Sequence, residues 1–229
     1  MQHYIRLRNS ISIALILCLA ILLNSCSGNS EKTISKQETT SLQDSFATQT
    51  EIADSIPGKL PANDSSLKAR SGQILKAIKE KDYETFASFM HPVRGMRFAS
   101  DGYIDTINHR KWSAAEFLMA TSNEKIYFWG LSDGSGDSIL LSLPAYFKKN
   151  VYPVDFLKAP QSSINKRLGQ GNSLNNIHEI YPLAEFRENY FPGFDKKYGG
   201  MDWQSLRLVM EFYQGQYYLV AVVHDHWTT

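Results

Sequence analysis

The sequence predicts an α+β domain in which N-terminal helices pack on a bent, mostly antiparallel sheet. Two observations support this fold class. Amphipathic segments with helix caps begin near residue 63, and alternating apolar segments typical of strands dominate the second half of the chain. Helices that precede a run of strands are typical of α+β proteins. The chain has 229 residues, of which 43% are hydrophobic, so it can form one domain with its own core.

The clearest strand signal is a C-terminal β-hairpin. Alternating runs over residues 205–213 and 216–224 flank a Gln-Gly pair at 214–215, and a two-residue loop containing glycine is a standard hairpin connection. Pairing Phe212 with Tyr217 gives the hairpin one wholly apolar face, which the core must cover. The opposite face is predicted to be open and carries Ser205, Arg207, Val209, Glu211, Tyr218, Val220, Val222 and His224.

The helices are predicted from their capping residues. Residues 63–66 offer N-caps for an amphipathic helix that runs to about Lys81, and Asp82 caps a second, short helix that ends before Pro92. A Ser-x-x-Glu capping box at Ser113 predicts a third helix.

Further strands are predicted between the helices and the C-terminal hairpin. They cover residues 96–99 and 103–106, 125–131 and 138–143, and 174–181 and 184–191. The intervening segment 152–171 shows little periodicity and is predicted to be a long loop, a candidate lid.

The N-terminus has the layout of a bacterial secretory signal. Arg6 and Arg8 precede an apolar run that is too short to span a bilayer and that ends at Leu23-Asn-Ser-Cys26. Residues 1–25 are therefore predicted to be a signal peptide, and their end resembles the lipobox of bacterial lipoproteins. The resemblance implies that Cys26 is acylated and anchors the chain to a membrane of the bacterial cell envelope. Ordinary signal-peptidase cleavage, with Cys26 a bystander, is the alternative.

The mature chain is predicted to consist of a tether and one domain. Residues 26–64 contain the lipidated cysteine and a polar sequence without regular apolar spacing, which favours a disordered tether over a docked segment. Residues 65–229 form the single α+β domain. Because Cys18 lies in the removed segment, the mature domain has no free thiol, which excludes disulfides, thiolate metal sites and cysteine nucleophiles.

The sequence also argues against several classes of ligand. The net charge of +1 and the absence of a Lys/Arg run give no electrostatic footprint for nucleic acid. The loop at 133–137 fails the EF-hand pattern, because Ser138 and Pro144 stand where glycine and glutamate are needed. Its glycines do not form a nucleotide-binding loop, and the GxSxG, SxxK, HExxH and CxxC motifs are absent. We therefore expect no cofactor.

Two resemblances bear on the fold. The order of the elements is similar to that of the cone-shaped NTF2-like fold, and this similarity implies a pocket between helices and sheet. A more specific set of phrases resembles a family of uncharacterised secreted and lipid-anchored bacterial proteins. These phrases are HPVRGMRF (91–98), WGLSDGSG (129–136), GQGN (169–172), FPGF (191–194), GMDWQSLRLVMEF (200–212) and HDHWT (224–228). The family brings no assigned activity, and a fold alone does not fix function.

Two histidines are candidate metal ligands. Residues two apart on a strand point to the same side, so His224 and His226 can present two imidazoles together. The local sequence lacks a third ligand, which only the fold could supply from His91, His109 or His178. The alternative is that the tail caps the sheet with both rings hydrogen-bonded.

A second group of polar side chains is a candidate ligand-binding set. Arg207 and Glu211 lie on the predicted open face, and Arg94 lies beside a helix break, where arginine can bind a carboxylate or phosphate. For each of them a structural role is the alternative. The full set is His91, Arg94, Arg207, Glu211, Tyr218 and His224.

The leading functional hypothesis is a lipid-anchored envelope protein whose domain binds a small ligand, a glycan or a protein partner without catalysis. The alternative is an envelope hydrolase or metal-dependent enzyme on the polar hairpin face, including a carboxylate pair of Glu211 with Asp202 or Asp225. The deciding observation is whether four side chains converge on one cavity, namely Arg207, Glu211, His224 and His226.

Overall fold

The computed structural model describes residues 64–169 and 171–228. The predicted signal peptide, Cys26 and all of the predicted tether except its last residue lie outside the described residues. Within the described part of the chain, no helix combines the length and the apolarity needed to cross a membrane.

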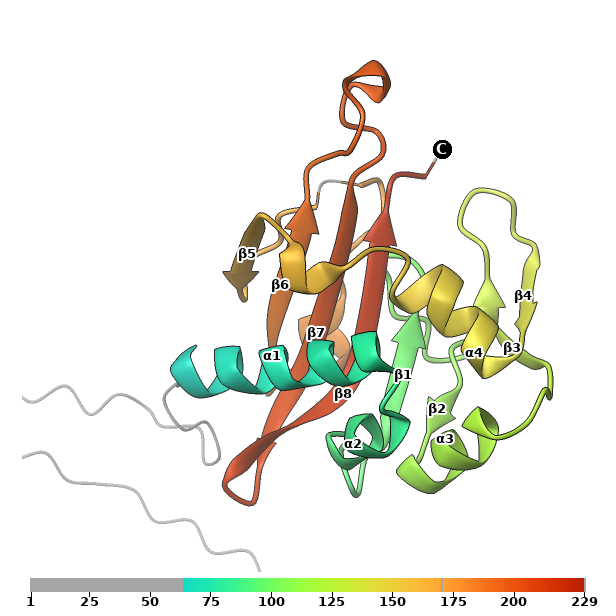
Figure 1. Ribbon diagram of the computed structural model, residues 1–229, viewed down its shortest axis with the longest axis vertical. Helices are drawn as coiled ribbons and strands as arrows, with labels where there is room; N and C mark the ends of the chain where they lie inside the picture. The colour runs from blue at the N-terminus through green and yellow to red at the C-terminus, as the bar shows by residue number, and fades with distance from the viewer. Residues whose placement is uncertain (1–63, 170, 229) are drawn as a thin grey trace, which may run out of the picture. The chain divides into compact units, whose positions relative to one another are not determined.

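The domain is built on a six-stranded sheet with the strand order β2-β1-β8-β7-β6-β5 (Figure 1). Neighbouring strands run antiparallel except β1 and β8, which pair in parallel. Strands β3 and β4 form a separate antiparallel hairpin. The strands are β1 (Met96–Ala99), β2 (Lys111–Trp112), β3 (Tyr127–Leu131), β4 (Ser138–Leu141), β5 (Gln161–Ile164), β6 (Glu185–Phe191), β7 (Gln204–Tyr213) and β8 (Gln216–His226).

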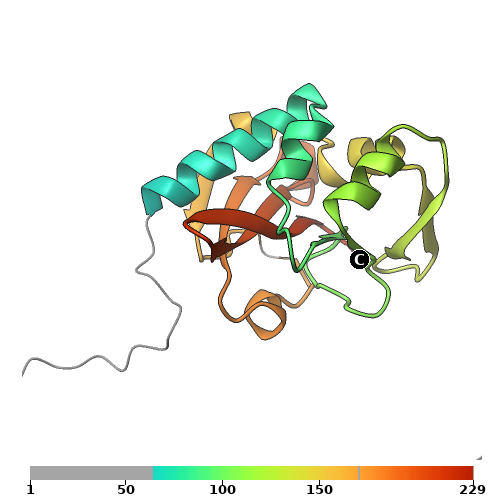
Figure 2. The ribbon, with the colours of Figure 1, turned by 90° about the horizontal axis from the view of Figure 1, so that it is seen from below.

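Helices and loops cover both faces of this sheet. Figure 2 shows α1 and α2 over one face and the segment around α5 on the other. The predicted α+β fold class is confirmed. The helices are α1 (Asp64–Glu80), α2 (Tyr83–Ser88), α3 (Ala114–Thr121), α4 (Leu143–Tyr146) and α5 (Ile177–Ile180), with a π turn η1 (Phe147–Val151) and 3-10 turns η2 (Phe156–Lys158) and η3 (Lys196–Tyr198).

The predicted caps of the second and third helices are confirmed. Asp82 accepts a hydrogen bond from the backbone N–H of Thr85 at 3.0 Å at the start of α2. Ser113 and Glu116 form both bonds of the capping box at the start of α3. Each cap satisfies backbone N–H groups that the first turn of a helix leaves unpaired.

Two cores lie on the two faces of the sheet. On the face that carries Leu206, Leu208 and Val222, here called the helix side, the helices close a large aromatic core. The rings of Trp129 and Tyr146 stack there with centroids 3.8 Å apart. On the opposite face, here called the loop side, α5 and its neighbours close a smaller apolar core; it contains Ile177, Phe186, Val209, Ala221 and Val223.

Two of the predicted strands are wrong. Residues 103–106 form no strand; the side chain of Asp105 instead accepts hydrogen bonds from the N–H groups of Ile107 and Asn108, which closes a turn. Residues 177–180, inside the predicted strand 174–181, form α5. Short apolar runs do not distinguish a strand from a single helical turn. Conversely, β5 lies inside the predicted loop 152–171 and pairs with β6.

The C-terminal hairpin has the predicted loop but keeps the predicted register only next to it. Phe212 pairs with Tyr217, and both loop residues have positive φ, which this tight connection requires. A bulge then shifts the register between Val209 and Met210, so that Val209 pairs with Ala221. A shift of one residue turns every later side chain of β8 to the other face.

The bulge changes which polar residues lie together. Arg207 pairs with Val223 and shares the loop side with Asp225, whereas His224 pairs with Leu206 and points to the helix side. The predicted open face is also wrong, because α5 and the loops cover it and Arg207 is completely buried.

Candidate functional site

Four of the six predicted ligand-binding residues meet at one end of the sheet. Arg94 Nη1 donates to both carboxylate oxygens of Glu211, at 2.6 and 2.8 Å. The ring of His91 lies 4.8 Å from the ring of Tyr213 and 5.9 Å from that of Tyr218.

The polar groups of this cluster form hydrogen bonds and an ion pair with one another. His91 Nδ1 accepts hydrogen bonds from the backbone N–H groups of Val93 and Arg94, at 3.2 and 3.1 Å, and burial lowers the pKa of His91. The imidazole is therefore a neutral acceptor that closes the turn after α2. Glu211 is buried and neutralised by Arg94. We therefore assign these residues a structural role at the end of the hairpin.

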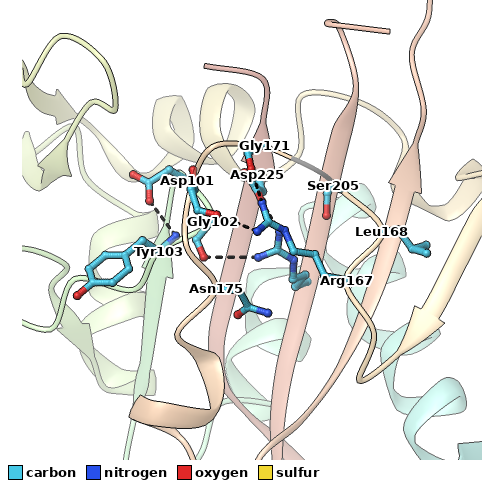
Figure 3. Close-up of polar contacts among 12 residues, drawn as sticks. Asp101, Gly102, Tyr103, Arg167, Leu168, Gly171, Asn175, Ser205 and Asp225 are labelled. Atoms are coloured by element: carbon cyan, nitrogen blue, oxygen red, sulfur yellow. Dashed lines mark hydrogen bonds and ion pairs between the residues drawn. The ribbon is translucent and has the colours of Figure 1, made fainter. Parts of the chain in front are cut away.

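Arg207 lies in a different place, in a buried ionic cluster on the loop side. Figure 3 labels two other members of this cluster, Arg167 and Asp225. Arg207 Nη2 donates to Asp225 Oδ2, its Nε lies 3.5 Å from Glu188 Oε1, and its Nη1 lies 3.5 Å from the carbonyl oxygen of Gly102. Arg167 Nη2 approaches the same Asp225 oxygen at 3.5 Å. Two guanidinium groups and two carboxylates thus balance one another in the interior, where an unpaired charge is costly.

The ionic cluster holds the loop that contains the GQGN phrase. Glu188 accepts hydrogen bonds from the N–H groups of Leu168 and Gly169, at 2.6 and 3.0 Å. Glycine is required here because a Cβ at Gly169 would lie 2.7 Å from the ring of Trp203, and one at Gly171 would lie 2.9 Å from it. Three separate phrases of the sequence, GQGN, GMDWQSLR and HDHWT, therefore meet at this cluster.

Sequence reasoning missed three members of the cluster. Nothing in the local sequence singles out Glu188 or Arg167, and Asp225 is predicted only as a partner for Glu211. A Gly-x-Gly phrase together with a distant Asp-Trp phrase is the available signal, since closely packed glycines often lie beneath a bulky ring.

Asp101 lies beside the cluster, and its pKa is raised. Burial, together with the neighbouring carboxylates of Asp133 and Asp225, raises the pKa of Asp101 to about 6 although the N–H of Tyr103 donates to it at 3.0 Å (Figure 3). Asp101 and Asp133 line a cavity of about 490 Å³ together with His109. This part of the surface therefore has an excess of negative charge near neutral pH.

The two candidate metal ligands lie side by side on the helix side. The rings of His224 and His226 stack with centroids 5.1 Å apart at 15°. His224 Nε2 lies 2.7 Å from Gln204 Oε1, and burial lowers the pKa of His224 to about 3, so this ring is neutral. Among the described residues, no group of three or more His, Cys, Asp or Glu side chains is placed to hold a metal ion. His109 lies elsewhere, since its Nδ1 accepts the N–H of Asp105 and the residue lines the cavity of Asp101 and Asp133.

A cavity of about 370 Å³, here called the tail cavity, opens where His226 reaches the edge of the helix side. It lies between the end of β8, the β3–β4 hairpin and η1. Thr228 closes one side by donating a hydrogen bond to Asp133 at 2.6 Å. The lining is Ser100, Ser132, Asp133, Ser135, Asp137, Ser138, Ile139, Leu140, Leu141, Lys149, Asn150, His226 and Thr228.

Comparison with known proteins gives similarity at the level of structure alone. No protein-family model and no curated protein sequence matches the chain, so the resemblance to a lipid-anchored family gains no support from them. Several solved structures are similar, and three of them follow. An NTF2-like protein of unknown function from Shewanella oneidensis has 10% identity and a TM-score of 0.33, over 72% of this chain and 99% of that chain.

The other two structures have comparable scores. The protein Aln2 from a Streptomyces species has 9% identity and a TM-score of 0.34, over 73% of this chain and 94% of that chain. A domain of unknown function with a cystatin-like fold from Nostoc punctiforme has 10% identity and a TM-score of 0.34, over 74% of this chain and 80% of that chain. Similarity at this level assigns no function to the chain.

Proposed function

We propose that this chain is a lipid-anchored protein of the bacterial cell envelope whose domain binds a saccharide unit of an envelope glycan, without catalysis, in the tail cavity. The observation that carries this proposal is the tail cavity itself. Its volume of about 370 Å³ lies within the range of small-molecule sites.

The chemistry of the lining favours a small ligand rich in hydroxyl groups. Serine and threonine hydroxyls can both donate and accept hydrogen bonds, the carboxylates of Asp133 and Asp137 accept them, and Lys149 and Asn150 donate them. His226 Nδ1 is buried without a hydrogen-bond partner among the described residues, and burial lowers the pKa of His226. The neutral ring of His226 is therefore part of the polar lining of the cavity.

The four side chains whose convergence on one cavity would indicate an enzyme do not meet at one place, which supports binding rather than catalysis. They are Arg207, Glu211, His224 and His226. Arg207 belongs to the ionic cluster, Glu211 pairs with Arg94, and the two histidines stack on the helix side. The carboxylates of the two proposed pairs have other partners. Glu211 pairs with Arg94, Asp225 pairs with Arg207, and Asp202 accepts the backbone N–H groups of residues 194 and 195. No observation favours the hydrolase hypothesis over the binding module.

The tail cavity is tested by saccharide binding in matched variants. The purified chain is expected to bind a muropeptide or an N-acetylglucosamine oligosaccharide, with a stabilisation of about 2.7 kcal/mol at a ligand concentration of about 100 Kd. Asp137→Ala and His226→Ala each remove hydrogen bonds and are expected to weaken binding about tenfold or more in titration calorimetry. Glu124→Ala changes an exposed residue outside the lining and serves as the control.

Two results would contradict this proposal. If the saccharide affinity is unchanged in both Asp137→Ala and His226→Ala, the saccharide does not bind in the tail cavity. If mass spectrometry detects cleavage products of the saccharide after incubation with the protein, the protein is an enzyme, and the hypothesis of binding without catalysis is wrong.

The membrane anchor is tested separately at Cys26. Cys26→Ala is expected to move the chain from the membrane fraction to the soluble fraction, because two or three acyl chains supply the stable anchoring. Cys18→Ala is the matched control and should leave the chain on the membrane, since that cysteine lies in the predicted signal peptide. An unmodified Cys26 in the mass spectrum of the mature N-terminal peptide would contradict lipidation.

A further inference from the structure

A second cavity, here called the aromatic cavity, lies on the loop side and has a different chemistry. Its volume is about 610 Å³. Trp227 lines it, whereas the neighbouring His226 and Thr228 line the tail cavity. The end of β8 therefore separates the two cavities, since successive side chains of an extended chain point to opposite sides. The side chains that decide its chemistry are Gln161, Lys166, Arg167, Tyr190, Trp203 and Trp227.

The aromatic wall of this cavity has a buried part and an exposed part. The rings of Trp203 and Tyr190 lie 6.0 Å apart at 47°. Trp203 is 5% exposed and packs so closely on Gly169 and Gly171 that a Cβ on either glycine would collide with its ring. Trp227 is 41% exposed and adds an accessible aromatic face. Aromatic faces that are already fixed bind the apolar face of a ring with little loss of side-chain entropy.

The charged part of the cavity is positive. Lys166 contributes a positive charge that no carboxylate of the described lining balances, and Arg167 contributes a guanidinium group that also faces Asp225 of the ionic cluster. Arg167 is held in place because its Nη1 donates to Ser173 O at 2.8 Å and its Nη2 donates to Gly171 O at 3.2 Å. The exposed Lys166 makes no ion pair with any described residue. An anionic group of a ligand is therefore favoured at this end of the cavity.

We infer that the aromatic cavity is a second binding site, for a saccharide that carries a carboxylate. The sugar ring packs on the exposed face of Trp227, and the carboxylate pairs with Lys166 beside Arg167. The amide of Gln161, the phenol of Tyr190 and the backbone of residues 199 and 200 provide partners for the hydroxyl groups. The buried ionic cluster positions this site, since Glu188 and Asp225 hold the loop that carries both cations.

The experiment uses trigalacturonate and its neutral methyl ester as probes for the purified full chain. The two probes have the same rings and hydroxyl groups and differ in charge. Titration calorimetry and tryptophan fluorescence are expected to show that the acid binds about tenfold or more tightly than the ester, and that salt weakens the binding of the acid. Equal affinity for both probes, or no binding of the acid at about 10 mM, would overturn the inference.

Two exposed lining residues supply the variants. Lys166→Glu reverses the charge at the cavity and Trp227→Ala removes an aromatic face, and each is expected to lower the affinity for trigalacturonate about tenfold. Lys148→Glu makes the same charge change at an exposed site outside the cavity and should leave the affinity unchanged. His226→Ala should also leave it unchanged, which separates this site from the tail cavity. Full affinity in both cavity variants would overturn the inference.

Discussion

Replacing Arg207 by methionine is expected to lower the free energy of unfolding by about 3–5 kcal/mol, because it leaves two buried carboxylates without their main counter-charge. Methionine fills a similar volume but forms no ion pair. Among the described residues, Asp225 would keep only Arg167 at 3.5 Å, and Glu188 would keep hydrogen bonds to the loop and to Ser205 but no cation. Urea unfolding followed by circular dichroism measures the change.

The loss is expected to depend on pH. Burial already raises the pKa of Asp225, against the opposing effect of Arg207 and Arg167. Removal of Arg207 raises this pKa further, so the contribution of Asp225 to stability is present at low pH and is lost as the pH rises through the folded-state value. The destabilisation by Arg207→Met should therefore be larger at pH 8 than at pH 5.

Two comparisons identify the cause. Arg110 forms an exposed ion pair with Glu116, so Arg110→Met should cost about 1 kcal/mol or less. Adding Asp225→Asn to Arg207→Met removes one of the stranded charges, so the double variant should lose less stability than the sum of the two single changes. Additive losses would contradict a direct interaction between these two side chains.

The second large effect is expected at Gly95, the glycine of the HPVRG phrase. Gly95 has φ of +64°, and a Cβ there would lie 2.4 Å from the backbone carbonyl oxygen of Trp112. Gly95→Ala therefore strains the local backbone and pushes β2 away from β1, where Met96 pairs with the buried Trp112. We expect a loss of about 2–4 kcal/mol in the free energy of unfolding.

Gly72 provides the matched control for this substitution. It lies inside α1, and nothing lies within 4 Å of a Cβ built there. Gly72→Ala should stabilise the protein by about 0.5–1 kcal/mol, because alanine is a better helix former than glycine. If the two alanine variants had the same stability, the close contact between Gly95 and Trp112 would not be the reason for glycine at that position.

Local features of the fold were predictable from the sequence because the residues that interact are neighbours in the chain. The cap at Asp82, the capping box at Ser113 and the Gln-Gly loop all depend on residues within four positions of one another. The α+β class follows from the order of such segments.

The register of the C-terminal hairpin was not predictable in the same way. Residues 219–223 are all apolar, so alternation does not show which residue is the extra one at the bulge. The packing of both faces decides that, and with it the place of Arg207. Tertiary packing also decides the partner of Glu211. This partner is Arg94, which lies more than a hundred residues earlier in the chain, rather than a residue of the hairpin.

The sequence by itself determined the fold class, the caps and turns, and which residue types are available for binding. The tertiary structure alone decided which charges meet, because ion pairs and cavities form between segments that are distant in the chain. The phrases GQGN and HDHWT are more than fifty residues apart, yet the buried charges of Arg207, Glu188 and Asp225 require them to lie together. A buried charge must be neutralised wherever the fold places it, and that requirement has no signature in local sequence.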